Sequence, residues 1–214
     1  MKKYAIFDLD GTLIDSMNVW DMAVCTFLRN KGIIMPNELI TVLNKKSFEQ
    51  GANYLIQQFT LDLTTEEVMA EIHDFIIHQY MNEVQLKPFV LEFLENVENQ
   101  NIKMCIVTAS EKKLAELVLK RLKVLDYFDF ILTCGEVGYG KDTPDIFYLA
   151  AQKWEANISE IMVFEDSLHA IQTTKAAGFY TIAVYDRSAD KDNKMIQQLS
   201  DKYISSFEEW RDAE

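Results

Sequence analysis

The chain has 214 residues, of which 49% are hydrophobic and 26% charged, ordinary proportions for a folded globular protein. Its formal net charge of −13 argues against nonspecific binding to nucleic acid or to an anionic membrane surface. No apolar run is long enough to span a bilayer, and three cysteines without CxxC spacing favour reduced thiols over a disulfide scaffold. Because no signal-peptide cleavage pattern follows the N-terminus, we expect a cytoplasmic protein.

The first predicted element is a buried strand. Tyr4–Phe7 is a continuous apolar run, typical of a strand covered on both faces of a parallel sheet. Asp8 and Asp10 follow it, and residues two apart on a strand face the same way, so they should converge before Gly11 turns the chain. Converging carboxylates repel unless a cation lies between them, and oxygen ligands suit Mg²⁺. The alternative is a plain Asp-Gly turn.

The next segment, residues 16–84, has helical periodicity and no strand candidate. Two capping boxes, beginning at Ser47 and at Thr64, each precede apolar residues at helical spacing. The second helix has an apolar stripe that is typical of a bundle core: Val68, Ile72, Ile76 and Tyr80. We therefore expect a small all-α helical bundle here.

After residue 85 the predicted helices alternate with strands. The expected helices are Phe89–Asn99, Glu111–Leu122, Pro144–Trp154 and Leu168–Ala177, and the expected strands are Lys103–Thr108, Phe130–Cys134, Ile161–Phe164 and Tyr180–Val184. Thr143 should cap the third helix, with Pro144 as its first residue. This alternation implies an α/β fold, a Rossmann-like parallel sheet with helices on both faces, which the N-terminal strand joins.

Two domains follow from these patterns. The α/β core is predicted to comprise residues 1–15 and 85–214, and residues 16–84 are predicted to form an inserted helical cap. An insertion directly after the Asp8–Asp10 turn should overhang the ligand crevice like a lid, with pivots near Asp15, Ser16 and Lys87.

Polar residues also follow two later strands. Ser110 comes after Thr108 and Ala109, where it is either a plain helix N-cap or part of an anion site at the helix start. Glu165-Asp166-Ser167 follows the strand that begins at Ile161, and it either caps the next helix or adds two carboxylates to the crevice.

Lys141 lies in a glycine-rich stretch that nearly matches a phosphate-binding P-loop. The match fails after the lysine, where Asp142 replaces the required Ser or Thr and would repel phosphate. A P-loop is therefore disfavoured, and a lone solvated lysine remains the plain alternative. In combination, however, four strand ends that supply carboxylates, a hydroxyl, a lysine and further carboxylates predict a phosphoryl-transfer site.

The same four motifs resemble those of the haloacid dehalogenase (HAD) superfamily. They stand in order as Asp8-Leu9-Asp10-Gly11-Thr12, Thr108-Ala109-Ser110, Lys141 with Pro144-Asp145, and Glu165-Asp166-Ser167. The resemblance covers the whole chain, and the inserted helices resemble the cap of the subclass that includes phosphoglycolate phosphatase and β-phosphoglucomutase. The motifs are specific for the family but do not identify one substrate.

This resemblance implies a mechanism. Asp8 would attack phosphorus and form an aspartyl-phosphate, while Asp10 would first protonate the leaving alcohol and then deprotonate the attacking water. Mg²⁺ would be held by Asp8, by the main-chain carbonyl of Asp10 and by Asp166. Because the family's second Asp distinguishes phosphatases and mutases from dehalogenases, the presence of Asp10 disfavours haloacid dehalogenation.

The remaining motif residues take supporting roles in the same resemblance. Thr108, Ala109 and Lys141 would bind the phosphoryl oxygens. Glu165 would hold metal-bound water or the lysine in place. The implied partner is a small phosphorylated metabolite such as a sugar phosphate, with no nucleic acid and no membrane, and a monomer is favoured although the sequence does not define the oligomeric state.

Phosphatase activity is the preferred interpretation, with a β-phosphoglucomutase-like phosphomutase as the alternative. The mutase branch carries a cap His and Arg near the positions of Trp20 and Phe48, and both are missing here. Lys45 and Lys46 either substitute for them or form a solvated pair, and the two aromatic residues either line a substrate pocket or pack the cap.

A non-enzyme alternative is a phosphoacceptor signalling switch. Receiver domains also combine an acceptor Asp, an acidic pair, a Thr and a Lys on a parallel sheet. Their acidic pair precedes the acceptor, however, whereas here Asp8 comes first and Glu165-Asp166 last, so this alternative is disfavoured.

Overall fold

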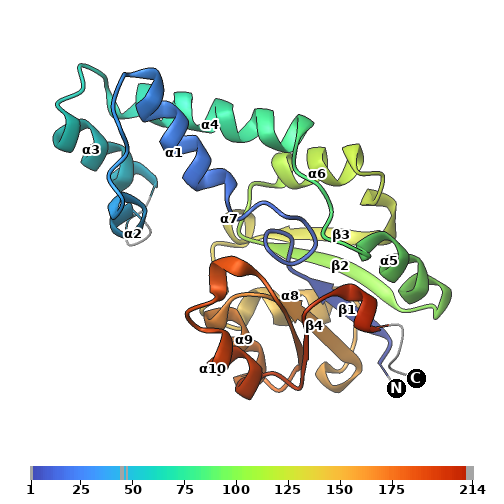
Figure 1. Cartoon of the computed structure of the whole chain (residues 1–214). Helices are drawn as coiled ribbons and strands as arrows, with labels where there is room; N and C mark the ends of the chain where they lie inside the picture. Colours follow the sequence, from blue (N-terminus) through green and yellow to red (C-terminus); the bar gives the residue numbers. More distant parts are fainter. Residues whose placement is uncertain (1, 44–45, 47, 211–214) are drawn as a thin grey trace. The chain divides into compact units, whose positions relative to one another are not determined.

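The structure, a computed structural model, describes residues 2–43, 46 and 48–210. Within these residues the chain forms a six-stranded, all-parallel sheet in the order β3-β2-β1-β4-β5-β6 (Figure 1). The central strand, β1, pairs with both β2 and β4, and open sheets of this kind bind ligands beyond the carboxyl ends of such strands. The strands are β1 (Tyr4–Phe7), β2 (Lys103–Thr108), β3 (Phe128–Thr133), β4 (Ile161–Glu165), β5 (Tyr180–Val184) and β6 (Lys202–Ile204).

Helices cover both faces of this sheet. On one face, Ile6 of β1 shares a buried cluster with Ile146 and Phe147. On the other, Phe7 stacks on Phe164 with ring centroids 4.6 Å apart and meets Phe93 edge-on at 5.8 Å. The helices that follow β1 in this unit are α5 (Val90–Asn99), α6 (Lys112–Arg121), α7 (Cys134–Val137), α8 (Asp145–Lys153), α9 (Leu168–Ala176) and α10 (Asn193–Leu199). The predicted α/β, Rossmann-like class is confirmed.

Short 3₁₀ turns connect several of these elements, and one of them ends the described chain. They are η1 (Leu125–Tyr127), η2 (Ile158–Glu160), η3 (Arg187–Ala189) and η4 (Phe207–Trp210). Phe207 of η4 is buried, and its ring centroid lies 4.7 Å from that of Phe93. The last described turn therefore packs against α5.

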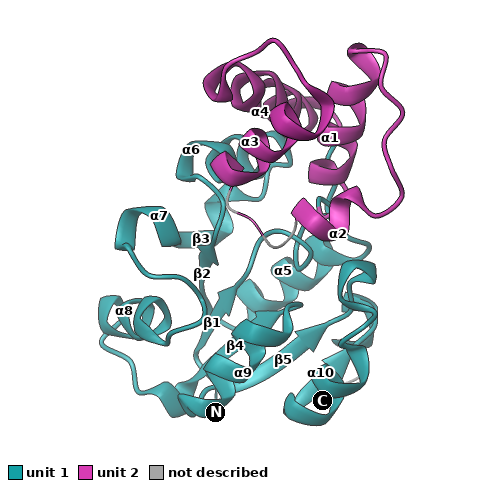
Figure 2. Ribbon diagram, turned by 90° about the vertical axis from the view of Figure 1, so that its left-hand side faces the viewer, with its two compact units in different colours: residues 1–16, 84–214 teal, residues 17–83 magenta. Residues whose placement is uncertain are grey.

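The chain divides into two compact units, residues 1–16 with 84–214, and residues 17–83 (Figure 2). The described part of the second unit is helical, as expected: α1 (Val19–Asn30), α2 (Leu39–Leu43), α3 (Phe48–Phe59) and α4 (Thr65–Asn82). The predicted stripe on α4 is buried, and the capping box at Thr64 is present, with Glu67 as its partner. Ser47, the start of the other predicted box, lies outside the described residues. That residues 16–84 act as a cap stays a prediction.

The chain leaves and re-enters the first unit through adjacent segments. Residues 13–15 and 85–87 pair as a short antiparallel ribbon, which we call the entry ribbon. In it, the amide of Asp15 donates to the carbonyl of Gln85 at 3.0 Å. The predicted pivots Asp15 and Lys87 therefore lie on paired segments.

Two local predictions were wrong, and two short elements were missed. Strand β3 ends at Thr133, because the Thr133 hydroxyl accepts from the Glu136 amide at 3.2 Å and so caps α7, which begins at Cys134. Thr143 does not cap α8: the residue before the helix is Pro144, and the Thr143 hydroxyl has no hydrogen-bond partner among the described residues. The short elements α10 and β6 were not predicted at all.

Candidate active site

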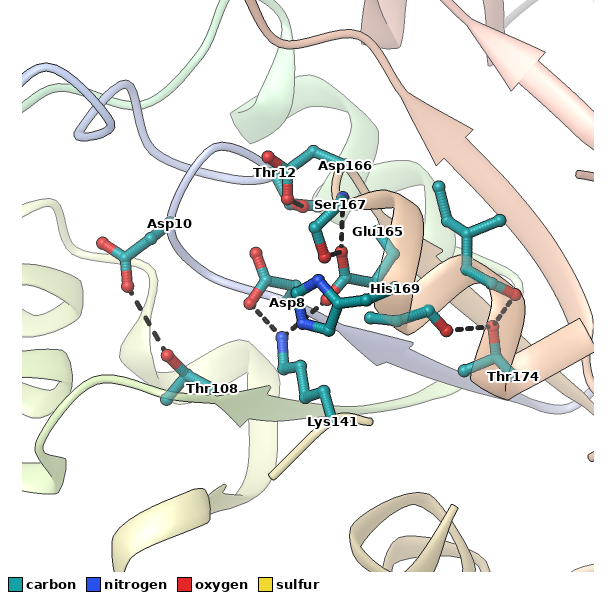
Figure 3. A network of polar contacts seen from close by, with 12 residues as sticks. Asp8, Asp10, Thr12, Thr108, Lys141, Glu165, Asp166, Ser167, His169 and Thr174 are labelled. Carbon is teal, nitrogen blue, oxygen red and sulfur yellow. Dashed lines mark hydrogen bonds and ion pairs between the residues drawn. The ribbon is translucent and has the colours of Figure 1, made fainter. Parts of the chain in front are cut away.

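Four polar residues meet at the carboxyl edge of the sheet. Strands β1 and β4 pair in parallel with Phe7 beside Phe164, and the Asp8 amide donates to the Phe164 carbonyl at 3.0 Å. This register places Asp8 beside Glu165 and Asp166. Lys141 reaches the same point from the loop between α7 and α8 (Figure 3).

The Lys141 ammonium joins two of these carboxylates. It forms an ion pair with Asp8 and another with Glu165, whose Oε1 lies 2.7 Å from Nζ. All three side chains are buried, with exposures of 6%, 7% and 1%. Burial by itself lowers the pKa of Lys141, but the charges of Asp8 and Glu165 outweigh it and raise that pKa above its ordinary value. Lys141 is therefore a fixed positive charge, and the solvated-lysine alternative is not what the structure shows.

Glu165 has donors on both of its oxygens. Oε1 accepts from Lys141, and Oε2 accepts from the Ser167 amide at 2.8 Å and from the Ser167 hydroxyl at 2.9 Å. Burial favours the neutral acid, but the Lys141 charge and the Ser167 hydrogen bonds outweigh it and lower the pKa of Glu165. Ser167 therefore donates to Glu165 and does not cap α9, because the Ser167 side chain makes no capping hydrogen bond at the start of that helix.

The other two acids, Asp8 and Asp166, have raised pKa values. Burial raises the pKa of Asp8 to about 7, against the opposing charge of Lys141. Burial, followed by the charges of Glu165 and Asp8, raises the pKa of Asp166 well above its usual range. Oδ2 of Asp8 is buried and has no hydrogen-bond partner among the described residues.

These observations fit a bound cation. One carboxylate oxygen each from Asp8, Glu165 and Asp166 lie within 4.8 Å of one another, and all three residues are buried. The pKa values of Asp8 and Asp166 are raised first by burial and further by neighbouring carboxylates, and a divalent cation would favour the ionised form of both acids. The residues present could therefore hold a hard, oxygen-coordinated metal ion.

Asp10 is not one of the three carboxylates of this cluster. In Figure 3 its carboxylate is turned toward Thr108 and away from Asp8 and Lys141. Its Oδ2 accepts from the Ser110 hydroxyl at 2.6 Å, and its Oδ1 accepts from the Ser16 hydroxyl at 2.6 Å. The two aspartates that we expected to converge thus have different hydrogen-bond partners, although the charge of Asp10 contributes to raising the pKa of Asp8.

The second predicted motif lies beside Asp10. Thr108 is fully buried at the end of β2, and its hydroxyl is 3.5 Å from Asp10 Oδ2. Ala109, predicted to bind phosphate, is exposed in the loop after the strand. Ser110 is not the N-cap of α6, because Glu111 holds that position.

Sequence reasoning missed three hydroxyl partners of the acidic residues. Ser16 and Ser110 donate to Asp10, and the buried Thr12 hydroxyl lies 3.4 Å from Oδ1 of Asp166. The available signal was that each hydroxyl stands within or just beyond a motif. Ser16 was noticed only as a pivot and Ser110 as a cap or anion donor.

The second unit has a pocket of its own. It has a volume of about 270 Å³ and a mostly apolar lining that includes Trp20, Phe48 and Lys46. The two aromatic rings also meet edge-on at 5.4 Å, so they both line the pocket and pack the unit. Lys45 lies outside the described residues.

The fold and site together define the class of protein: a doubly wound α/β enzyme with a buried lysine and an acidic cluster that could hold a cation at the carboxyl edge of its sheet. The sequence model of the haloacid dehalogenase-like hydrolases matches residues 5–184, and the chain belongs to this family. The predicted family is confirmed, which sets aside the P-loop and signalling-switch alternatives.

Sequence relatives in this family are named as phosphatases. The chain is 28% identical to the fructose-1-phosphate phosphatase of Escherichia coli over 86% of this chain and 97% of that protein. It is 27% identical to hexitol phosphatase B of Escherichia coli over 96% of this chain and 92% of that protein.

Solved structures show the same fold. A Thermotoga maritima protein assigned to the β-phosphoglucomutases superposes with a TM-score of 0.87 at 23% identity, covering 100% of this chain and 98% of that one. A predicted phosphoglycolate phosphatase from Haemophilus somnus gives 0.82 at 20% identity, covering 99% and 97%. Among the described residues, none of the helices has the length and apolar character needed to cross a membrane.

Proposed function

We propose that the protein is a Mg²⁺-dependent phosphatase that hydrolyses a small phosphomonoester, such as a sugar phosphate, through an aspartyl-phosphate on Asp8. The observation that carries this proposal is the buried Lys141 ammonium, which is paired with both Asp8 and Glu165 beside Asp166. A lysine held there can bind phosphoryl oxygens next to a carboxylate nucleophile. The names of the sequence relatives support the substrate class.

The first step forms a bond between a carboxylate oxygen of Asp8 and phosphorus and breaks the bond from phosphorus to the leaving alcohol. Asp10 gives its proton to the departing oxygen. In the second step Asp10 takes a proton from a water molecule whose oxygen attacks the same phosphorus, which releases phosphate and restores Asp8. Splitting one displacement into two makes each of them easier.

The remaining residues hold the phosphoryl group and the metal. Lys141, with Thr108 and Ala109, binds the phosphoryl oxygens. Asp8, the carbonyl of Asp10 and Asp166 would hold Mg²⁺, which when bound shields the nucleophile from the substrate dianion and neutralises developing charge. Glu165 supports this site indirectly, since both of its oxygens already accept hydrogen bonds from Lys141 and Ser167.

The test is phosphate release by the purified protein with Mg²⁺, across sugar phosphates, phosphoglycolate, nucleotides and p-nitrophenyl phosphate. We expect release from one class of phosphomonoester, loss of release with EDTA, and recovery with added Mg²⁺. Asp8→Asn, purified in the same way, controls for contaminating phosphatases. No release from any substrate would overturn the proposal, and conversion of β-glucose 1-phosphate to the 6-phosphate in its place would establish the phosphomutase.

A further inference from the structure

The side chain of Asp10 is held at both oxygens by neutral hydroxyl groups. Ser110 donates to Oδ2 and Ser16 donates to Oδ1, each at 2.6 Å, which is a short distance for a hydrogen bond between two oxygens. The two donors come from distant parts of the sequence. Ser16 ends the N-terminal segment of the first unit, and Ser110 follows β2. Contacts on both oxygens restrict rotation of the carboxylate about its own axis.

The loop that carries Ser110 is itself anchored. The Ser110 amide donates to the Thr108 hydroxyl at 3.0 Å, and Thr108 is fully buried at the end of β2. Strand β2 lies between β1 and β3 inside the sheet. Ser110 is therefore placed by the rigid core, and its hydroxyl is aimed at Asp10 from a fixed point.

A hydroxyl is a suitable partner for a residue that gains and loses a proton in each turnover. It can donate to the carboxylate and accept from the carboxylic acid, so one contact persists through the transfer. An ammonium has no acceptor lone pair and can serve only the carboxylate. Asp8 is paired with such an ammonium. Among the groups that contact Asp10 are the hydroxyls of Ser16 and Ser110, which can keep their hydrogen bonds when Asp10 gains or loses a proton.

We propose that Ser110 is a positioning residue, which holds the Asp10 carboxylate in the orientation from which it transfers protons. The proposal deepens the proposed function and rests on it, because it assumes that Asp10 is the general acid and base. Ser110 acts through Asp10 and need not touch the reacting atoms. Its removal should therefore affect only those steps in which Asp10 moves a proton.

The test compares two leaving groups. An alkyl phosphate needs a proton on its departing oxygen, whereas p-nitrophenolate leaves readily without one. The ratio kcat/KM reports the steps up to the first phosphoryl transfer, and kcat also includes hydrolysis of the aspartyl-phosphate. For Ser110→Ala we expect kcat/KM to fall about 10-fold with the best alkyl phosphate of the panel and to stay within about twofold of wild type with p-nitrophenyl phosphate.

The controls separate positioning from damage to the fold. Ser110→Thr restores a hydroxyl and should recover the alkyl phosphate activity, while Ser110→Cys, a nearly isosteric and weaker donor, should give an intermediate loss. Ser206→Ala removes a comparable half-buried hydroxyl near the C-terminus, and we expect no change with either substrate. Asp10→Asn sets the full size of the leaving-group effect, and thermal unfolding verifies that each variant is folded.

The outcomes distinguish a failure of the proposed role of Ser110 from a failure of the proposed function. Suppose that the wild type is active and that Asp10→Asn loses more kcat/KM with the alkyl phosphate than with p-nitrophenyl phosphate. If Ser110→Ala and Ser110→Cys show no such difference, the role of Ser110 is overturned and the proposed function stands. Equal losses with both substrates would likewise overturn positioning. A wild-type protein that releases no phosphate from any substrate overturns the proposed function, and the role of Ser110 with it.

Discussion

Asp8 and Asp10 stand two residues apart in the sequence, yet the fold places them in opposite environments. Asp8 is buried and paired with a lysine in a cluster that includes Glu165. Asp10 is partly exposed and receives hydrogen bonds from hydroxyls. A hydroxyl suits a residue that exchanges protons, because it can donate to the carboxylate and accept from the carboxylic acid. Burial and the ion pair with Lys141 therefore set Asp8 apart from Asp10, although both are aspartates.

The largest effect is expected from removing the charge of Asp8. Asp8→Asn keeps the shape of the side chain but deletes the nucleophile, and we expect kcat to fall at least about 10³-fold. The matched control is Asp142→Asn, which removes an exposed carboxylate next to Lys141 and should keep wild-type activity. Retained turnover in Asp8→Asn, measured as phosphate release, would contradict the assignment of the nucleophile.

The ion pairs around Asp8 can be broken from the other side. Lys141→Met leaves the buried Asp8 and Glu165 without their cation, and we expect the free energy of unfolding in EDTA to fall by about 3 kcal/mol. Lys112→Met is the control, because it breaks an exposed pair with Glu136 and should cost less than about 1 kcal/mol. Urea denaturation measures both variants, and equal losses would show that burial of the cluster has no energetic consequence.

The stability of the metal-free protein should also depend on pH through Asp8. The pKa of Asp8 is about 7 in the folded protein against an ordinary value of 3.8, so the folded state holds a proton that the unfolded chain releases. The stability of the metal-free protein should therefore fall as the pH rises from about 4 to about 7, with Asp8 contributing at most about 1.4 kcal/mol per pH unit. Above that range its contribution is constant.

The measurement is urea unfolding of wild type and Asp8→Asn in EDTA at a series of pH values. Asp8→Asn should show a shallower decline than wild type, since it lacks the titrating group. Added Mg²⁺ should flatten the wild-type curve, because a bound cation favours the ionised carboxylate. Identical slopes in the two proteins would contradict the pKa shift of Asp8.

Much of the fold and the charged cluster could be predicted because both depend on strong local signals. Apolar runs such as Tyr4–Phe7 define buried strands, and parallel strands bring residues at their carboxyl ends to one edge. Asp8 and Glu165 follow from this rule, whereas Lys141, in the loop between α7 and α8, follows from the family motifs. Strand β6 could not be predicted in the same way, because three residues are too few to show a period.

The partners of Asp10 could not be predicted because they depend on loop geometry. Ser110 sits two residues beyond β2, where a serine is equally suited to cap a helix, and only the bond from its amide to Thr108 turns it toward Asp10. Thr143 was predicted to be a cap for a similar reason: it is a good capping residue, but it stands one position before Pro144, the residue that precedes α8. Short-range hydroxyl contacts are decided by a single backbone turn.

The entry ribbon brings the two ends of the helical unit close together. The Asp15 amide and the Gln85 carbonyl are hydrogen-bonded at 3.0 Å, so the excursion of residues 17–83 begins and ends at almost the same point in space. A tight turn that joined residue 16 to residue 84 would close this gap without stretching the sheet. The helical unit is therefore separable in principle, and it could be deleted or exchanged for another while the carboxylate cluster keeps its own scaffold.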